Sequence, residues 1–183
     1  MNCIDLMVEE HRNIKRMLAV IRKYCYKVLK NEKVQYEDFF TLIDFVRNYA
    51  DRHHHGKEEE LLFNRMMNEL GSAAEKLVRH GMLVEHDFGR LYIQELEAAV
   101  KRVMDGDDES RLDVIANAIS YTHLLHRHID KEDAVVFKFA ENNFSKETLE
   151  AINLDCERFE REAREGNIQQ KYLDILAEFE AKV

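Results

Sequence analysis

Apolar residues recur at three- and four-residue spacing along almost the whole chain, which is the pattern of amphipathic helices. Four such stripes follow one another, over residues 4–25, 39–61, 82–103 and 114–139. Turn-like interruptions separate them at residues 31–33, 70–72 and 105–108. Short breaks make consecutive helices antiparallel neighbours, so the pattern predicts an all-α fold, an up-down-up-down antiparallel four-helix bundle.

Two further amphipathic stretches follow the fourth stripe, with Ser145 as a helix start and Gly166 as an interruption. We therefore expect a bundle over residues 1–142 and a C-terminal helical extension over residues 143–183. The extension either packs on or beside the bundle, or uses residues 145–183 for self-association or for binding a protein partner. The sequence leaves these alternatives open.

The composition limits the classes of partner. The 183 residues include no proline and 34% charged residues, which suits long helices. A net charge of -9 without a basic block argues against nucleic-acid binding. No apolar run approaches the roughly 20 residues of a membrane span, and the N-terminus lacks the pattern of a signal peptide. Three widely spaced cysteines indicate reduced thiols, so we expect a cytoplasmic protein that is not bound to membranes.

A duplicated motif carries the candidate chemistry. Residues 54–63 and 128–137 both read His-x-x-Lys-Glu-acid-x-apolar-apolar-Phe, 74 positions apart. A His and a Glu four residues apart lie on one helix face, one turn above the other, and form a pair of metal ligands. A Glu-His pair precedes each motif, at residues 10–11 and 85–86. The repeated unit is therefore a helical hairpin with one His on its first helix and His-x-x-x-Glu on its second.

The candidate ligands share one level along the bundle. In two antiparallel helices joined by a turn, residues that are equally far from the turn on either side lie at the same height along the bundle. The midpoint of positions 11 and 54 falls in the first break, that of 58 and 86 at the second, and that of 86 and 128 in the third. All four helices thus bring candidate metal ligands together on their core-facing stripes: His11, His54, Glu58, His86, His128 and Glu132.

Buried glutamates are costly unless they are paired or bound to a metal, and a buried His–Glu network without metal is the alternative explanation. Four imidazoles and two carboxylates suit two borderline metal ions that share bridging carboxylates. Iron fits best, because carboxylate bridges and vacant positions allow oxygen chemistry. Structural zinc more typically uses a closed set of four ligands that often includes cysteine. No histidine follows a Glu by three residues, so the ferritin-like pattern is absent.

These motifs resemble the hemerythrin-like family, the His-His-Glu cation-binding domains, over roughly residues 4–140. The resemblance implies a four-helix bundle with a non-haem centre of two Fe ions, bridged by Glu58, Glu132 and an oxo or hydroxo group. Oxygen-carrying relatives have a His where Met82 stands and an Asp at the position of Asp133. The missing His favours the six-ligand bacterial and regulatory branch over the seven-ligand oxygen carriers.

Other polar residues near the motifs are further candidates for metal ligands or for hydrogen-bond partners of the ligands: His55, Glu59, Asp133 and His123. His53 lies about 100° around the helix from His54 and is expected to be solvated. Apolar side chains within about two turns of the ligands are expected to line a small-ligand pocket: Leu62, Phe63, Met66 and Met82.

Three functions fit this centre. The first is a protein that binds or senses oxygen, nitric oxide or peroxide at a carboxylate-bridged pair of irons. The second is a di-iron redox enzyme, such as a peroxidase, a nitric oxide reductase or an iron-centre repair factor, because one site hosts several activities. The third is a binding module in which iron orders the bundle and residues 145–183 contact a partner.

Overall fold

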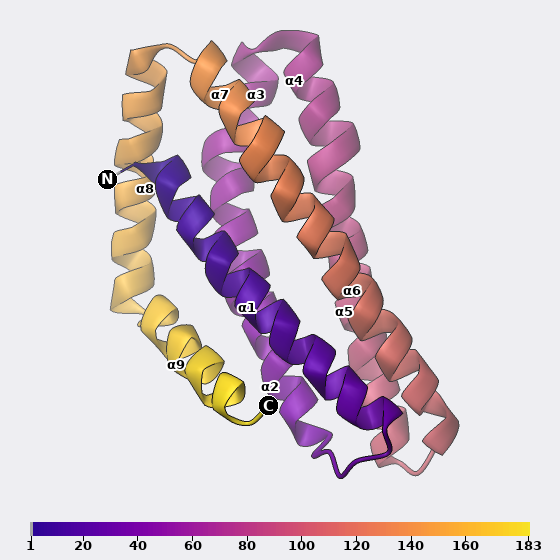
Figure 1. Ribbon diagram of the computed structural model, residues 1–183. Helices are drawn as coiled ribbons and strands as arrows, with labels where there is room; N and C mark the ends of the chain where they lie inside the picture. The colour runs from indigo at the N-terminus through magenta and orange to yellow at the C-terminus, as the bar shows by residue number, and fades with distance from the viewer. Residues whose placement is uncertain (1) are drawn as a thin grey trace.

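The computed structural model describes residues 2–183, and this part of the chain is helical almost throughout (Figure 1). The long helices of the bundle are α1 (Cys3–Leu29), α5 (Leu83–Met104) and α6 (Arg111–Lys131). The shorter segments that continue or precede them are α2 (Glu37–Phe45), η1 (Val46–His55), η2 (Glu58–Phe63), α3 (Asn64–Glu69), α4 (Gly71–Leu77), η3 (Val78–Met82), η4 (Asp108–Ser110), η5 (Glu132–Val136) and α7 (Phe137–Asn143). The C-terminal extension consists of α8 (Lys146–Glu165) and α9 (Ile168–Ala181).

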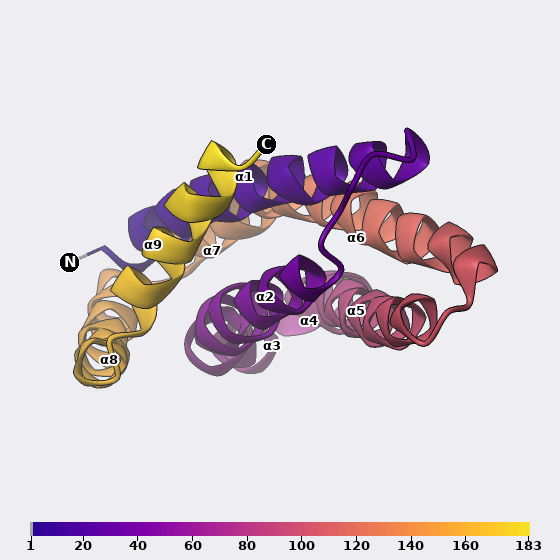
Figure 2. The ribbon, with the colours of Figure 1, turned by 90° about the horizontal axis from the view of Figure 1, so that it is seen from below.

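The bundle has four arms that alternate in direction. They are α1, then α2 to α3, then α4 to α5, and then α6 to α7 (Figure 1). Seen from below, α1 and the α6–α7 arm form one layer over the other two arms (Figure 2). The predicted all-α bundle is confirmed, and its breaks fall at the predicted turns. Gly71 and Gly106 have φ angles of 73° and 101°, the left-handed conformation in which glycine has no steric penalty.

Side-chain oxygens begin two of the helices. The Asn2 side chain accepts hydrogen bonds from the backbone N–H groups of Ile4 and Asp5 at the start of α1. The Ser145 hydroxyl accepts one from Thr148, so α8 begins where the sequence predicts a helix start. Both satisfy backbone donors that have no partner inside their own helix.

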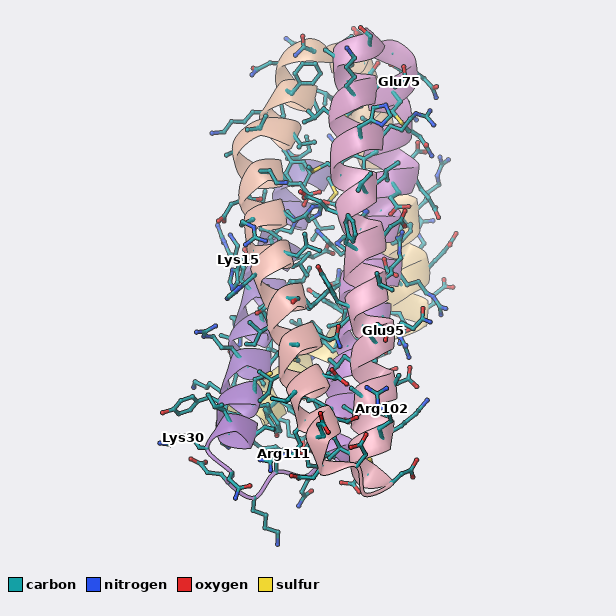
Figure 3. The ribbon with its side chains drawn as sticks, turned by 90° about the vertical axis from the view of Figure 1, so that its right-hand side faces the viewer. Lys15, Lys30, Glu75, Glu95, Arg102 and Arg111 are labelled. Atoms are coloured by element: carbon teal, nitrogen blue, oxygen red, sulfur yellow. The ribbon has the colours of Figure 1, made fainter. Side chains whose placement is uncertain are left out.

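The apolar interior consists of two clusters on either side of a polar level. One contains Leu18, Tyr49 and Val100, and the other contains Met7, Phe63 and Phe137. Every arm crosses from one cluster to the other at the level of the candidate ligands. Charged side chains such as Lys30, Glu75 and Glu95 project outward instead (Figure 3). The apolar packing therefore fixes the four arms on both sides of the polar level.

π-helical segments flank this level. They are η1 and η2 on the second arm, η3 on the third and η5 on the fourth. A π-helix forms its hydrogen bonds five residues apart and is wider than an α-helix, and such segments occur often at functional sites. In the second arm, three consecutive histidines at residues 53–55 are all buried at the end of η1.

The C-terminal extension packs on one edge of the bundle. Helix α8 contacts α1 and η2, and α9 contacts α1 and η1 (Figure 2). The three cysteines are free and buried, as the sequence predicts for reduced thiols. Within residues 2–183, no helix is both long and apolar enough to cross a membrane.

Candidate metal centre

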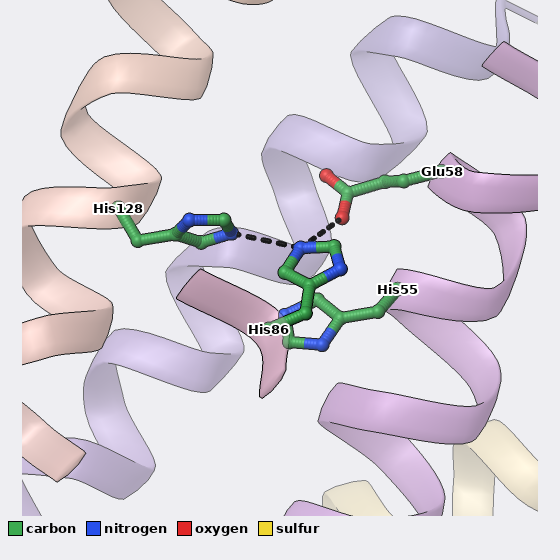
Figure 4. Close-up of side chains that lie close together, drawn as sticks. All are labelled: His55, Glu58, His86 and His128. Carbon is green, nitrogen blue, oxygen red and sulfur yellow. Dashed lines mark hydrogen bonds and ion pairs between the residues drawn. The ribbon is translucent and has the colours of Figure 1, made fainter. Parts of the chain in front are cut away.

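Seven buried side chains form two adjoining clusters at the polar level. One cluster contains His11, His54, Glu58 and Glu132, and the other contains His55, Glu58, His86 and His128. Within each cluster the atoms that could bind a metal lie within 4.8 Å of one another. Figure 4 shows the second cluster, with side chains from three arms pointing toward one another. All six candidate ligands that the sequence predicts are therefore brought together.

The two carboxylates reach both clusters. Glu58 Oε1 lies 3.4 Å from His54 Nε2, and Glu58 Oε2 lies 3.7 Å from His86 Nε2. Glu132 Oε2 lies 3.3 Å from His11 Nε2, and Glu132 Oε1 lies 3.0 Å from His128 Nε2. Each glutamate thus directs one oxygen to each side, which is the arrangement that a carboxylate bridging two metal ions requires.

The inner atoms of this site have no hydrogen-bond partner within residues 2–183. They are both oxygens of Glu58, both oxygens of Glu132, and the Nε2 atoms of His11 and His54. An unsatisfied buried carboxylate is costly, whereas metal coordination would satisfy all six atoms at once. His86 Nε2 and His128 Nε2 also face each other at 3.0 Å, an arrangement that a proton or a metal cation between them stabilises. This donor set fits a pair of borderline metal ions.

Every histidine of the two clusters donates a hydrogen bond to a carboxylate from Nδ1, the ring nitrogen that faces away from the centre. The pairs are His11–Asp133 at 2.7 Å, His54–Glu10 at 2.8 Å, His55–Asp51 at 3.3 Å, His86–Glu59 at 2.7 Å and His128–Glu85 at 2.9 Å. A carboxylate only accepts, so each bond places the proton on Nδ1 and leaves Nε2 for the centre. Such outer carboxylates orient metal-binding imidazoles and make them more basic.

Four of these outer carboxylates follow the sequence repeat. Glu10 and Glu85 are equivalent, and each accepts from the His of the second helix in its own repeat. Glu59 and Asp133 are also equivalent, and each accepts from the first-helix His of the other repeat. Glu59 and Asp133 were predicted as candidates. Glu10 and Glu85 have no predicted role beyond the repeat, and their 75-residue offset is the signal that marks them as equivalent.

His55 is the main addition to the six candidates. Its ring stacks on His86 with centroids 3.8 Å apart, and it belongs to the same cluster (Figure 4). From the sequence His55 is a candidate of lower rank than His54, because His55 with Glu59 forms a second His–Glu pair one residue out of register with His54 and Glu58. At the end of the π-helical η1 both histidines face the centre. His55 therefore provides a fifth imidazole, although Met82 stands where oxygen carriers have a His.

Without a bound metal, the buried histidines and glutamates of the centre shift one another's pKa values. Burial opposes protonation of His128, but the charge of the nearby Glu132 and the hydrogen bond to Glu85 outweigh it and raise its pKa to about 10. The pKa values of His11, His54 and His86 are raised for the same kind of reason. Burial and the neighbouring His86 instead lower the pKa of His55 to about 3.

The pKa values of the two inner glutamates are lowered. For Glu58, burial and the charge of Glu132 oppose ionisation, but the surrounding imidazoles outweigh them. For Glu132, burial is likewise outweighed, mainly by the charge of His128. A metal ion therefore competes with protons for the imidazoles and finds the carboxylates already ionised.

Two predictions for other histidines are wrong. His123 is exposed and lies 3.4 Å from Arg22, away from both clusters, because five residues before His128 is about 140° around an α-helix. His53 is buried rather than solvated, since helices α8 and α9 cover its side of the bundle. Its ring lies 5.6 Å from that of Phe159, and its Nε2 lies 3.1 Å from Glu10.

The four residues predicted to line a small-ligand pocket are all buried in the apolar cluster beside the centre: Leu62, Phe63, Met66 and Met82. The Phe63 ring lies 6.0 Å from that of His86. A cavity of about 100 Å³ reaches the centre from the other side, where His55 and His86 form part of its wall. This cavity is lined by Val46, Arg47, Asp51, His55, His86, Gly89, Arg90, Ile93 and Tyr121.

His55→Ala is expected to lower the metal content from about two ions per chain to about one. Only one of the two clusters contains His55, so the other keeps all its candidate ligands. The measurement is metal content after anaerobic loading with iron(II) and gel filtration. The matched control is His123→Ala, which removes an exposed histidine outside the site. Retention of two ions in His55→Ala would show that the cluster does not use this imidazole.

The comparison with protein families agrees with this geometry. The chain matches the family described as the Hemerythrin HHE cation binding domain over residues 2–140. The matched region includes both copies of the repeat and all seven side chains of the two clusters, and it ends before α8. The comparison with curated proteins gives no match. The resemblance read from the motifs is confirmed, and the chain belongs to the hemerythrin family of HHE cation-binding domains.

Proposed function

We propose that this protein holds two iron ions and binds or senses a small oxidant or diatomic molecule, namely oxygen, nitric oxide or peroxide. The observation that carries the proposal is the pair of buried glutamates, Glu58 and Glu132. Each directs one oxygen to each cluster, and none of these oxygens has a hydrogen-bond partner in the part of the chain that the structure describes. Histidine and carboxylate ligands without cysteine suit iron better than a structural zinc site.

The cavity beside the second cluster supports a small ligand rather than a large substrate. Its volume of about 100 Å³ admits a few atoms, and the buried rings of His55 and His86 form part of its wall. A Cβ atom at Gly89 would lie 3.5 Å from the Tyr121 ring, so the glycine leaves part of this space open. On the outer side, Arg90 is bound to Asp51 at 3.0 Å and to Glu59 at 2.8 Å.

The chain's own residues have distinct roles in this proposal. Bound iron would supply an open coordination position and electron transfer. The outer carboxylates hold the imidazoles with Nε2 toward the centre, and the apolar clusters on both sides exclude water. Burial, then the charge of Asp51, raise the pKa of Tyr121 well above its usual value. Tyr121 therefore stays protonated in the cavity and is available as a hydrogen-bond donor.

The test is to measure metal content and the optical spectrum of protein purified without oxygen and then exposed to air. We expect about two irons per chain and new near-ultraviolet bands of oxygen-bridged iron. Bands that revert when oxygen is removed support a reversible binder, and bands that persist support a redox sensor. A folded chain that takes up no iron would contradict the proposal.

A redox enzyme is the second candidate, and the position of Tyr121 favours it. Its ring lies in the wall of the cavity, next to where a bound oxidant would sit, and a protonated phenol can donate a proton together with an electron. The measurement is steady-state consumption of hydrogen peroxide by the iron-loaded protein with an added reductant. Consumption that Tyr121→Phe lowers at least tenfold, at unchanged iron content, would favour the enzyme over the binder.

A further inference from the structure

A buried lysine joins the metal centre to the C-terminal extension. Lys57 has no exposed surface, and its ammonium group donates to Glu10 Oε1 at 2.5 Å and to Glu160 Oε1. Glu160 belongs to α8, outside the region that matches the family. Its other oxygen accepts from the Gln169 side chain at 2.6 Å. His53 Nε2 lies 3.1 Å from Glu10 and 3.4 Å from Glu160.

These contacts form a continuous chain from a candidate ligand to α8. Glu10 accepts from His54 Nδ1 at 2.8 Å through Oε2, and it binds Lys57 through Oε1. Lys57 in turn binds Glu160. Glu10, Lys57 and Glu160 are all buried, so these interactions are strong, and the loss of one partner leaves a buried charge unpaired.

The second copy of the sequence repeat contains an equivalent series of contacts that the C-terminal extension does not cover. Lys131 lies 74 residues after Lys57 and binds Glu85, which accepts from His128 Nδ1 at 2.9 Å. Lys131 is 45% exposed, whereas Lys57 is 0% exposed. The same Lys–Glu–His arrangement therefore occurs twice, and it is buried only where the C-terminal extension covers it. The two candidate metal positions thus differ in their outer surroundings.

We propose that Glu160 is a positioning residue of the metal centre, which acts through Lys57 and Glu10 on His54. The inference rests on the proposed function, because it assigns a role toward the same centre. Glu160 holds the Lys57 ammonium group in place, and Lys57 in turn holds the Glu10 carboxylate. Glu10 sets the orientation and basicity of the His54 ring. The C-terminal extension therefore takes part in the site and does not only cover the bundle.

A third metal site is the competing explanation of this cluster. Glu10, His53 and Glu160 lie close enough together to hold a cation. The Lys57 ammonium already provides that cation, because it binds both glutamates. The cluster is therefore satisfied by the chain itself, unlike the centre formed by Glu58 and Glu132.

The test compares Glu160→Gln with Asp155→Asn. Asp155 also joins α8 to the bundle, through Arg65 at 2.7 Å, but neither of its partners touches the centre. We expect Glu160→Gln to weaken iron(II) binding about 3- to 10-fold, less than the 10- to 100-fold typical of a direct outer partner. Asp155→Asn should leave the affinity within about twofold of the wild type, since it leaves the outer carboxylates in place.

A measurement on the metal-free protein separates positioning from folding. The nitrogen-15 resonances of the His54 ring should shift in Glu160→Gln and stay in place in Asp155→Asn. The double variant Lys57→Met with Glu160→Leu removes both members of one buried ion pair, while Glu10 keeps its hydrogen bonds with His53 and His54. It should recover part of the thermal stability that Glu160→Gln loses, without restoring iron affinity. Recovery of affinity together with stability, or His54 resonances that do not move in Glu160→Gln, would overturn the inference. A wild-type chain that binds no iron contradicts the proposed function, and the metal-free resonances still decide the role of Glu160.

Discussion

Glu58→Gln is expected to abolish tight binding of both metal ions while the helical bundle stays folded. Glu58 is the one side chain that belongs to both clusters, and its two oxygens point to different sides. Glutamine keeps the shape but removes the charge and replaces one oxygen by a donor. Loss of an outer partner alone costs 10- to 100-fold in affinity, so loss of a shared ligand should cost more than about 100-fold at each position.

The measurement is a titration with iron(II) under anaerobic conditions, with circular dichroism to establish that the helices remain. Glu60→Gln is the matched control, because it makes the same change two residues further along at an exposed position. It should bind two ions like the wild type. A Glu58→Gln variant that retains either ion with nearly full affinity would show that the carboxylate does not bridge.

The position of the site along the bundle axis could be predicted because two independent features of the sequence agree. Helical spacing fixed which residues face the core, and the mirror positions of the three turns fixed their height. The doubling of the motif in residues 54–63 and 128–137 then made an accidental cluster improbable. The same reasoning gave the direction of all four arms, and the helix-start residue Ser145 separately gave the start of α8.

The errors lie where local geometry departs from a regular α-helix or where another segment covers a face. His55 depends on the π-helical end of η1, which no spacing rule indicates. His53 is covered by Phe159 and Gln169 of the extension, whose position the sequence left open. The outer carboxylates Glu10 and Glu85 are visible in the repeat. Each accepts a hydrogen bond from a His on a neighbouring helix, however, and not from the His that follows it directly in the sequence.

Without metal, the protein is expected to lose stability as the pH rises above about 6.5. His128 has a folded pKa of about 10 against about 6.5 for an unfolded histidine, and the pKa values of His11, His54 and His86 are also raised. Between these values the folded state binds more protons than the unfolded state. The free energy of unfolding therefore falls, on the order of 1 kcal/mol per pH unit for each such proton.

Metal loading is expected to reverse this trend, which makes pH dependence a test of the whole site. Metal ions bind the neutral imidazoles, so affinity rises with pH as the competing protons are lost. The stability gained from binding grows with affinity, and the difference in Tm between iron(II)-loaded and metal-free protein should widen from pH 6 to pH 8.5. Glu85→Gln removes the negative charge from the group that accepts from His128 Nδ1 and helps to raise the pKa of His128, so it should flatten the metal-free trend. Metal-free protein whose Tm rises over this range would show that its imidazoles are not held protonated by the surrounding carboxylates.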